Sequence, residues 1–204
     1  YLDILKYAYV ADGDAGLQII NVSDPNYPTP AKENFNTLGT AMDVYVSGDY
    51  AYIANGYAGL QIVNISDPNN PTLAGAYNTS GYAWGVYVSG NYAYVADYNS
   101  GLQIINVSNP NYPTPVKEDF DTLGAAYEVY VSGDYAYVAN GGSGQRIVNV
   151  SHPSSPTLAG ACCVADTARG IYVSGNYAYV AVTSSGLQII NVSNPSSPSW
   201  VGGY

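Results

Sequence analysis

Charged side chains are scarce in this sequence of 204 residues, which has 15 acidic and 5 basic groups, one His, one Met and two Cys. Long solvated helices need charged outer faces and an uninterrupted backbone. Because the sequence also has 22 Gly and 12 Pro, we exclude an all-helical fold. The formal net charge of −10 argues against nucleic acid as a partner, since two anionic surfaces repel each other at long range.

Long apolar runs are also absent, and without a stretch of 18 apolar residues we expect no direct insertion into a membrane. The chain begins Tyr1-Leu2-Asp3, which fits a mature protein after removal of a signal peptide or an excerpt of a longer chain. Cys162 and Cys163 are adjacent and have no nearby Cys or His partners, so we expect neither a disulfide nor a metal site there. We interpret them as small strand residues, with a reactive or intermolecular thiol as the alternative.

Repetition is the most abundant feature. The segment Gly59–Pro68 (GLQIVNISDP) recurs with small changes, and a second block (VYVSG, then Asp or Asn, then YAYVA) recurs with the same period. The copies of the first segment begin at Gly16, Gly59, Gly101, Gly144 and Gly186. A period of 40 to 45 residues that holds four short strand-like runs is typical of a β-propeller, in which each period forms one blade.

The second unit shows the expected strands. Val44–Ser47 ends at a Ser-Gly-Asp turn, Tyr50–Ala54 ends at Asn-Gly, and Leu60–Ile65 ends before two prolines that cannot donate to a ladder. Thr72–Thr79 supplies the fourth, outermost strand. The third strand is apolar on both faces, as a blade between two neighbours requires. We therefore predict an all-β, five-bladed β-propeller with four antiparallel strands per blade, a single domain with units at about 1–43, 44–85, 86–128, 129–170 and 171–204.

Tyrosine is over-represented, with 23 copies, and most of them occupy a few repeat positions. Large aromatic rings with a polar tip can fill the wedges between blades while each hydroxyl finds a partner. We therefore interpret the tyrosine excess as packing. One such position, in the first strand of each unit, is Tyr45, Tyr87, Tyr130 and Tyr172.

The Leu-Gln-Ile-Ile-Asn-Val-Ser-Asn-Pro runs resemble the LVIVD repeat, which occurs in bacterial and archaeal surface or secreted proteins. The resemblance covers nearly the whole chain in five copies. It implies a β-propeller and an extracytoplasmic setting, secreted or at the cell surface. It implies no catalytic site, because the family has no established common activity.

One position departs from the family throughout, because Asn stands where the family usually has Asp. The change creates Asn-x-Ser sequons, and Asn78-Thr79-Ser80 adds another. An Asn that enters a proline turn also commonly caps the backbone ahead of it. Turn capping and glycosylation are therefore alternatives at Asn21, Asn64, Asn106, Asn149 and Asn191, with Asn78 as a further candidate for glycosylation.

The short segments just before the first strands differ between units, although their flanks do not. In a propeller these positions open onto the central funnel. Two carboxylates, a guanidinium and two aromatic rings suit a sugar or a small cationic ligand. The alternative is a mouth that holds only water. The candidate binding residues are Met42, Asp43, Trp84, Tyr127, Glu128 and Arg169.

Two other kinds of chemistry have weaker support. Asp12 and Asp14 have the Asp-x-Asp spacing of a calcium loop, but no bidentate Glu follows, so a simple turn is the alternative to calcium as a cofactor. The only histidine, His152, lies in a Ser-x-Pro turn opposite the expected mouth, which leaves no His-based triad. Asp43 and Glu128 are the one candidate acid–base pair, as a glycosidase or lyase would need.

The leading hypothesis is a non-catalytic, secreted or surface-displayed propeller that serves as a structural or interaction module. Its outer strands carry little charge to protect their edges, so self-association into a surface layer, adhesin or fibre is physically reasonable. The expected partners are a protein or a second copy of the chain. The alternative function is recognition of a glycan or a small cation at the funnel mouth.

Overall fold

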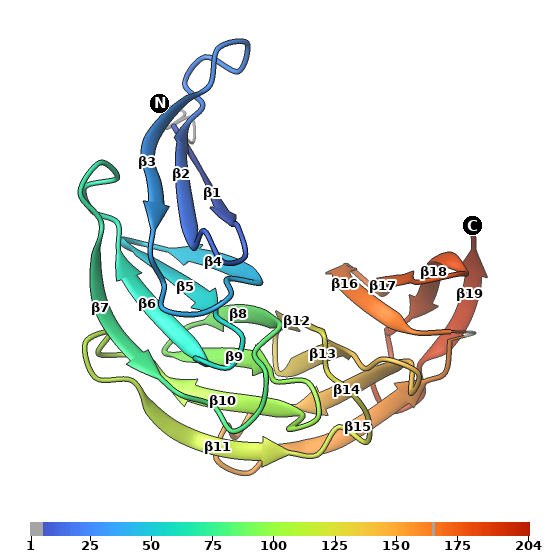
Figure 1. The fold of residues 1–204 in the computed structure, drawn as a ribbon. Coiled ribbons are helices and arrows are strands. Elements are labelled where there is room, and N and C mark those ends of the chain that lie inside the picture. Colours follow the sequence, from blue (N-terminus) through green and yellow to red (C-terminus); the bar gives the residue numbers. More distant parts are fainter. Residues whose placement is uncertain (1–5, 165) are drawn as a thin grey trace.

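The computed structural model of the chain describes residues 6–164 and 166–204. These residues form β-strands and no helix, so none of them belongs to a helix that could cross a membrane. The strands form five antiparallel sheets that follow one another along an arc (Figure 1). We number these sheets as blades 1 to 5 in chain order.

Within each blade the strands follow chain order from the inside of the arc outward. Blade 1 has β1 (Tyr7–Ala11), β2 (Leu17–Asn21) and β3 (Thr29–Phe35). Blade 2 has β4 (Asp43–Ser47), β5 (Tyr50–Ala54), β6 (Leu60–Asn64) and β7 (Thr72–Tyr77). Blade 3 has β8 (Gly85–Ser89), β9 (Tyr92–Ala96), β10 (Leu102–Asn106) and β11 (Thr114–Phe120). Blade 4 has β12 (Glu128–Ser132), β13 (Tyr135–Ala139), β14 (Gln145–Asn149) and β15 (Thr157–Cys162). Blade 5 has β16 (Ala168–Ser174), β17 (Tyr177–Val182), β18 (Gly186–Asn191) and β19 (Ser199–Gly203).

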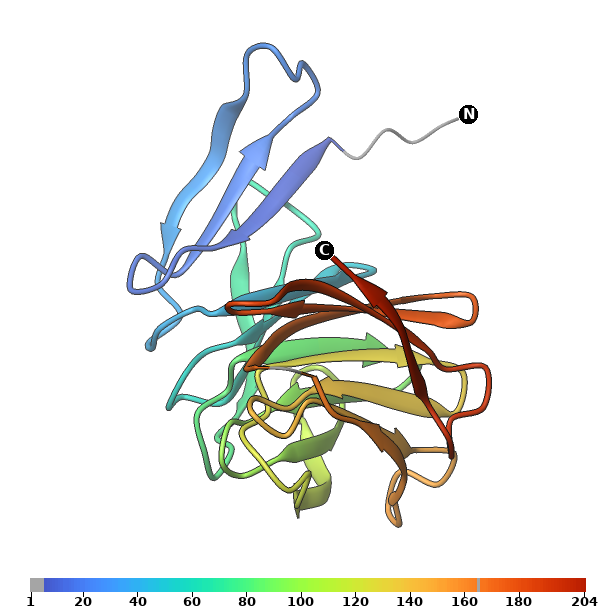
Figure 2. The ribbon, with the colours of Figure 1, turned by 90° about the vertical axis from the view of Figure 1, so that its right-hand side faces the viewer.

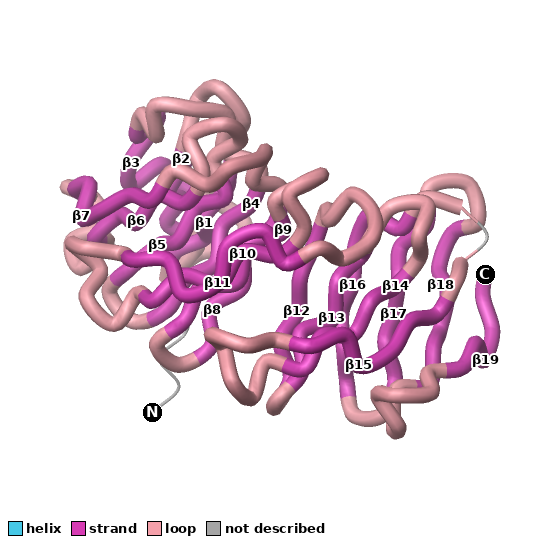
Figure 3. The backbone as a smooth tube through the Cα atoms, turned by 90° about the horizontal axis from the view of Figure 1, so that it is seen from below, coloured by secondary structure: helices cyan, strands magenta, loops and turns pink. Residues whose placement is uncertain are grey.

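The all-β class and the antiparallel sheets agree with the sequence prediction, but two details differ. Blade 1 has three strands among the described residues instead of four, and a further inner strand would fall before Tyr7, where residues 1–5 lie outside the described part. The blades also form an open arc instead of a closed ring. In Figures 1 and 2 the sheets of blades 1 and 5 stand apart, and Figure 3 shows β3 and β19 at opposite ends.

Each internal blade is apolar on both faces, as the sequence predicts. We call the face toward the following blade the forward face and the opposite one the rear face. Because side chains alternate along a strand, neighbouring residues of one strand belong to different faces. In blade 2 the forward face consists of Tyr52, Ala54, Leu60 and Ile62, and the rear face consists of Ala51, Ile53, Val63 and Ile65.

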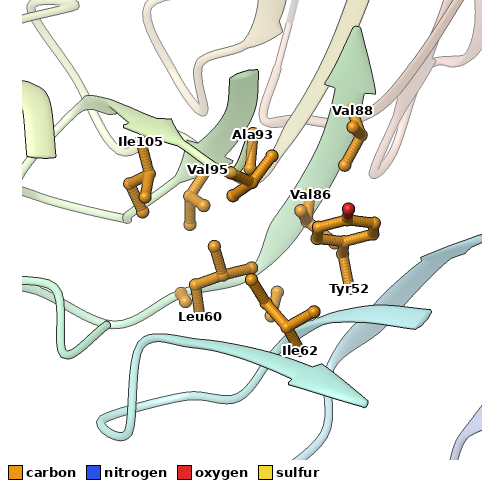
Figure 4. Packing of buried hydrophobic residues seen from close by; sticks show 11 residues of the cluster. Tyr52, Leu60, Ile62, Val86, Val88, Ala93, Val95 and Ile105 are labelled. Carbon is orange, nitrogen blue, oxygen red and sulfur yellow. The ribbon is translucent and has the colours of Figure 1, made fainter. Parts of the chain in front are cut away.

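Packing of a forward face on a rear face is the unit of the core. Figure 4 shows Leu60 and Ile62 of blade 2 pointing toward Val95 and Val86 of blade 3. These side chains are almost completely buried, and full burial of one such side chain stabilises a fold by roughly 1.5–3 kcal/mol. The same pairing of faces joins every blade to the next.

Backbone bridges also join successive blades at one end of the arc. The loop between the second and third strands of one blade pairs with an alanine at or just before the start of the first strand of the next, as in the reciprocal bonds between Gly56 and Ala83, 3.2 and 3.0 Å. The last glycine of this loop, Gly59, has φ +72°, and a Cβ there would collide with the backbone of Tyr77 and Thr79. This explains why glycine occupies that position in every unit.

The tyrosines of the first strands form a ladder across the inside of the arc. The ring centroids of Tyr45 and Tyr87 are 4.6 Å apart, those of Tyr87 and Tyr130 4.9 Å, and those of Tyr130 and Tyr172 5.0 Å. Burial and the neighbouring hydroxyls raise the pKa of Tyr87. The packing role predicted for this repeat position is confirmed.

Candidate functional site at the mouth of the arc

The structure brings all six predicted mouth residues together. They line one cavity of about 220 Å³, bounded by Met42, Asp43, Trp84, Tyr127, Glu128 and Arg169. The local reason is the backbone bridge between blades, which fixes a buried alanine in each connecting segment, such as Ala83 or Ala126. The residues that follow this alanine then start the innermost strand and face the mouth.

Asp43 is half-buried and fixed by backbone donors of two blades. Its Oδ1 accepts a hydrogen bond from the Val44 N–H at 2.8 Å, and its Oδ2 accepts one from the Val86 N–H at 2.9 Å. Burial raises the pKa of Asp43, and these two hydrogen bonds oppose the rise. The carboxylate is therefore held rigidly in place while remaining poorly solvated.

Glu128 is the second half-buried carboxylate, and its Oε1 accepts a hydrogen bond from the Val129 N–H at 3.1 Å. Burial and, after it, the charge of Asp43 raise the pKa of Glu128 to about 8. Gly85 lies beside it, since a Cβ on Gly85 would be 3.0 Å from Glu128 Oε1. Within residues 6–164 and 166–204, the hydrogen bonds to these two carboxylates come from backbone N–H groups and none from a lysine or arginine.

Aromatic rings continue the cavity outward. The Trp84 ring centroid lies 5.4 Å from that of Tyr82 and 5.4 Å from that of Tyr127, and the Arg169 guanidinium carbon lies 3.9 Å above the Tyr127 ring. A neighbouring cavity of about 410 Å³ shares part of this wall. Its lining residues are Tyr57, Tyr82, Trp84, Tyr98, Tyr127 and Arg169.

The sequence analysis missed Tyr57, Tyr82 and Tyr98. Tyr57 and Tyr98 lie in the loops between second and third strands, and both break the repeat pattern of those loops. Tyr98 also has φ +52°, at a position where three other blades have a glycine of similar φ. Divergence between repeats would therefore have found these two residues if it had been applied to every loop on this end.

The candidate calcium ligands have separate partners. Asp14 Oδ1 accepts a hydrogen bond from the Thr40 hydroxyl at 2.9 Å, and Asp12 Oδ2 lies 3.4 Å from the Gln18 side-chain nitrogen. Among the described residues, no group of three or more His, Cys, Asp or Glu side chains is placed to hold a metal ion. The geometry of the loop is thus that of a hydrogen-bonded turn.

The repeated asparagines cap the proline turns. In each copy the Asn Oδ1 accepts a hydrogen bond from the backbone N–H two residues ahead, for example from Ser66 to Asn64 at 2.9 Å. The same bond is present at Asn21, Asn106, Asn149 and Asn191. Turn capping is therefore confirmed. Glycosylation stays a prediction at these positions and at Asn78. The capping hydrogen bond uses the side-chain oxygen of the asparagine and not its nitrogen, which is the atom that would carry a glycan. Cys162 and Cys163 are free cysteines in the structure.

Five successive antiparallel sheets with two-sided apolar blades define a repeat protein of the β-propeller class. The chain belongs to the LVIVD-repeat family, because the model of that family matches residues 6–37, 38–79, 80–122, 123–164 and 165–204. No curated protein matches the chain.

Solved structures support the fold. A functionally unknown protein from Desulfotomaculum acetoxidans is 18% identical, with a TM-score of 0.78 over 99% of this chain and 70% of its own. A putative 6-phosphogluconolactonase from Bacteroides uniformis is 18% identical, with a TM-score of 0.76 over 96% of this chain and 67% of its own. The β-propeller domain of Cps50 (Swd1) from Myceliophteria thermophila is 12% identical, with a TM-score of 0.77 over 98% of this chain and 68% of its own. At these identities the likeness shows the fold alone.

Proposed function

We propose that this protein is a non-catalytic binding propeller that holds a small organic cation at the mouth of the arc. The observation that carries the proposal is the pair of half-buried carboxylates, Asp43 and Glu128, beside the aromatic wall of Trp84 and Tyr127. The backbone N–H groups that bond these two carboxylates carry no net charge. A bound cation would place a positive charge beside them.

The shift at Glu128 favours a cation over a neutral sugar. A neighbouring positive charge favours the ionised carboxylate, whereas burial disfavours it. Since the pKa of Glu128 is raised to about 8, binding of a cation would release a proton near neutral pH. The Trp84 ring, which lines the same cavity, can add cation–π attraction of about 0.5–2 kcal/mol.

The two tryptophans make a direct test possible, because Trp84 lies in the site and Trp200 lies on β19. In a Trp200→Phe background, all tryptophan fluorescence comes from Trp84. Titration with choline should change this fluorescence saturably, and the affinity should increase as the pH rises through 8. Methyl glucoside, a neutral probe, should have no effect at the same concentrations.

Matched variants separate charge from shape. Glu128→Gln keeps the size of the side chain but removes its charge, so it should weaken choline binding at least tenfold and abolish the pH dependence. Glu33→Gln changes an exposed carboxylate on β3 and should leave the titration unchanged. Binding of the sugar but not of choline would replace the cation proposal with the glycan alternative. A fluorescence signal that responds to neither probe contradicts both.

The proposal also includes the location of the protein in the cell and a structural or interaction role. The family resemblance supports a secreted or cell-surface location, which fractionation of the producing cells would test. A structural or interaction role gains support from the outer strands, which leave one edge of each sheet unpaired and expose Leu73, Leu158 and Trp200.

A further inference from the structure

We propose that copies of this chain associate head to tail, with the forward face of blade 5 of one copy packed on the rear face of blade 1 of the next. This surface is distinct from the mouth and from the outer strand edges. It does not depend on the cation proposal, because none of the mouth residues takes part.

The two faces at the ends of the arc have the composition of buried faces but are uncovered. On the rear face of blade 1, Val10 is 40% exposed. On the forward face of blade 5, Leu187 is 41% exposed, whereas Leu60 and Leu102 are fully buried at the same repeat position. The residues of blades 2 to 5 that correspond to Val10 are all fully buried, namely Ile53, Val95, Val138 and Val180.

An open cavity of about 560 Å³ lies over the uncovered rear face of blade 1. Ile20 and Pro28 are among its lining residues, and Ile20 corresponds to Ile105 of blade 3, which is 1% exposed. At the internal interfaces this space is filled by the forward face of the preceding blade. Among residues 6–164 and 166–204 no sheet packs on this side of blade 1, and its apolar surface is partly exposed.

The interface between blades 2 and 3 shows which surface each end fits. Gly75 of β7 lies under the proline turn of blade 3, because a Cβ there would collide with the Pro110 carbonyl oxygen and lie 3.0 Å from Pro113 Cδ. Gly160 of β15 has the same relation to Pro195 and Pro198 of blade 5. At these two interfaces a glycine on the outer strand therefore receives the proline turn of the following blade.

Gly202 of β19 is the unoccupied copy of this receiving position. It pairs with Ile189, as Gly75 pairs with Ile62, but nothing lies within 4 Å of the place a Cβ would take. The turn that would fill it is Pro25–Pro28 of blade 1, which repeats the Pro110–Pro113 turn of blade 3.

A polar contact matches as well. The Tyr77 hydroxyl of blade 2 donates a hydrogen bond to Glu118 of blade 3. Their repeat equivalents are Tyr204, which is fully exposed beside β18, and Glu33, which is exposed on β3. A second copy would thus reproduce the apolar faces, the proline turn over a glycine and the tyrosine–glutamate pair. Because the two faces differ, such contacts build either a ring of copies or an open chain.

The first test is the mass of the protein in solution as a function of concentration. The wild-type mass should rise above the 21.5 kDa of one chain as concentration increases. Gly202→Leu should keep the mass at one chain, because the new side chain fills the receiving position, and it should not disturb the isolated fold, since that position is empty. The control is Gly142→Leu, another glycine with nothing within 4 Å, which should associate like the wild type.

The second test uses the polarity of the contact. Val10→Asp blocks the rear face of blade 1 and should also give a single chain. An equimolar mixture of Val10→Asp and Gly202→Leu should yield dimers and nothing larger, because one intact end remains on each variant. Circular dichroism identical to the wild type establishes that both variants are folded. A wild-type mass that never exceeds one chain, or variants that associate as the wild type does, would overturn the proposal.

Discussion

The internal blades and the terminal blades of this protein share a sequence pattern but differ in environment. Leu60 of blade 2 and Leu187 of blade 5 occupy the same repeat position, yet the first is fully buried and the second is 41% exposed. Likewise Val95 is fully buried and Val10 is 40% exposed. The comparison shows that the repeat determines which faces are apolar, whereas the place of a blade in the arc determines whether they are covered. Such nearest-neighbour stability is characteristic of repeat proteins.

The largest difference between internal and terminal blades should come from truncation of the equivalent leucines, Leu60 and Leu187. Leu60→Ala should lower the free energy of unfolding by roughly 2–5 kcal/mol, because it leaves a cavity between two blades. Leu187→Ala should cost less than about 1 kcal/mol, since solvent already reaches the side chain. Urea unfolding at concentrations where the chain is monomeric measures both values. Equal losses would show that the terminal faces are covered in solution.

The second prediction concerns an irregularity inside the internal set. Gln145 stands where blades 1, 2, 3 and 5 have leucine, and its side chain is fully buried with neither polar atom hydrogen-bonded. Gln145→Leu should therefore raise the free energy of unfolding by roughly 1–3 kcal/mol, because it removes an unsatisfied buried amide. Differential scanning calorimetry would register this as a higher Tm.

Gln103 is the matched control for that substitution. It is equally buried, but its amide nitrogen donates hydrogen bonds to Asp97 at 3.1 Å and Asp119 at 2.8 Å. Gln103→Leu should lower the Tm, because it removes one hydrogen-bond donor from each of these two carboxylates. If both substitutions change the Tm in the same direction, hydrogen bonding of the buried amide does not explain their effects.

The third prediction concerns the pH dependence of stability at the mouth, which belongs to the covered part of the arc. The pKa of Glu128 is raised from 4.5 to about 8 in the folded protein. Between these values the folded state binds more protons than the unfolded chain, so the free energy of unfolding should fall as the pH rises from about 4.5 to about 8. Glu128→Gln should flatten this decline, measured by urea unfolding across the pH series.

Asp43→Asn further tests whether Glu128 causes the pH-dependent decline in stability. It removes a charge that raises the pKa of Glu128 in the folded protein, so the decline should still begin near pH 4.5 but should end at a lower pH. A pH profile that neither substitution changes would mean that other groups control the stability in this range.

The candidate site was partly predictable. Comparison of the units singled out Asp43, Trp84 and Glu128, because these positions differ between units whereas the segments on either side are nearly identical. Tyr57 and Tyr98 were missed because the comparison of units was not applied to the loops between second and third strands. That these two residues and Tyr82 share a cavity wall with Trp84 and Tyr127 depends on how neighbouring blades are placed. The raised pKa of Glu128 was likewise not predictable, because it depends on desolvation and on a charge from another blade.

The sequence by itself determined the period, the strands and the two-sided apolar blades, because turn residues and alternation are local properties of the chain. It also determined the asparagine caps, whose partners lie two residues away. Only the tertiary structure decided that the arc stays open and which faces are left uncovered. It also decided that a proline turn covers Gly75 whereas nothing lies within 4 Å of the Cβ position of Gly202. These features depend on the rotation between successive blades, which accumulates over the whole chain and is not encoded in any single repeat.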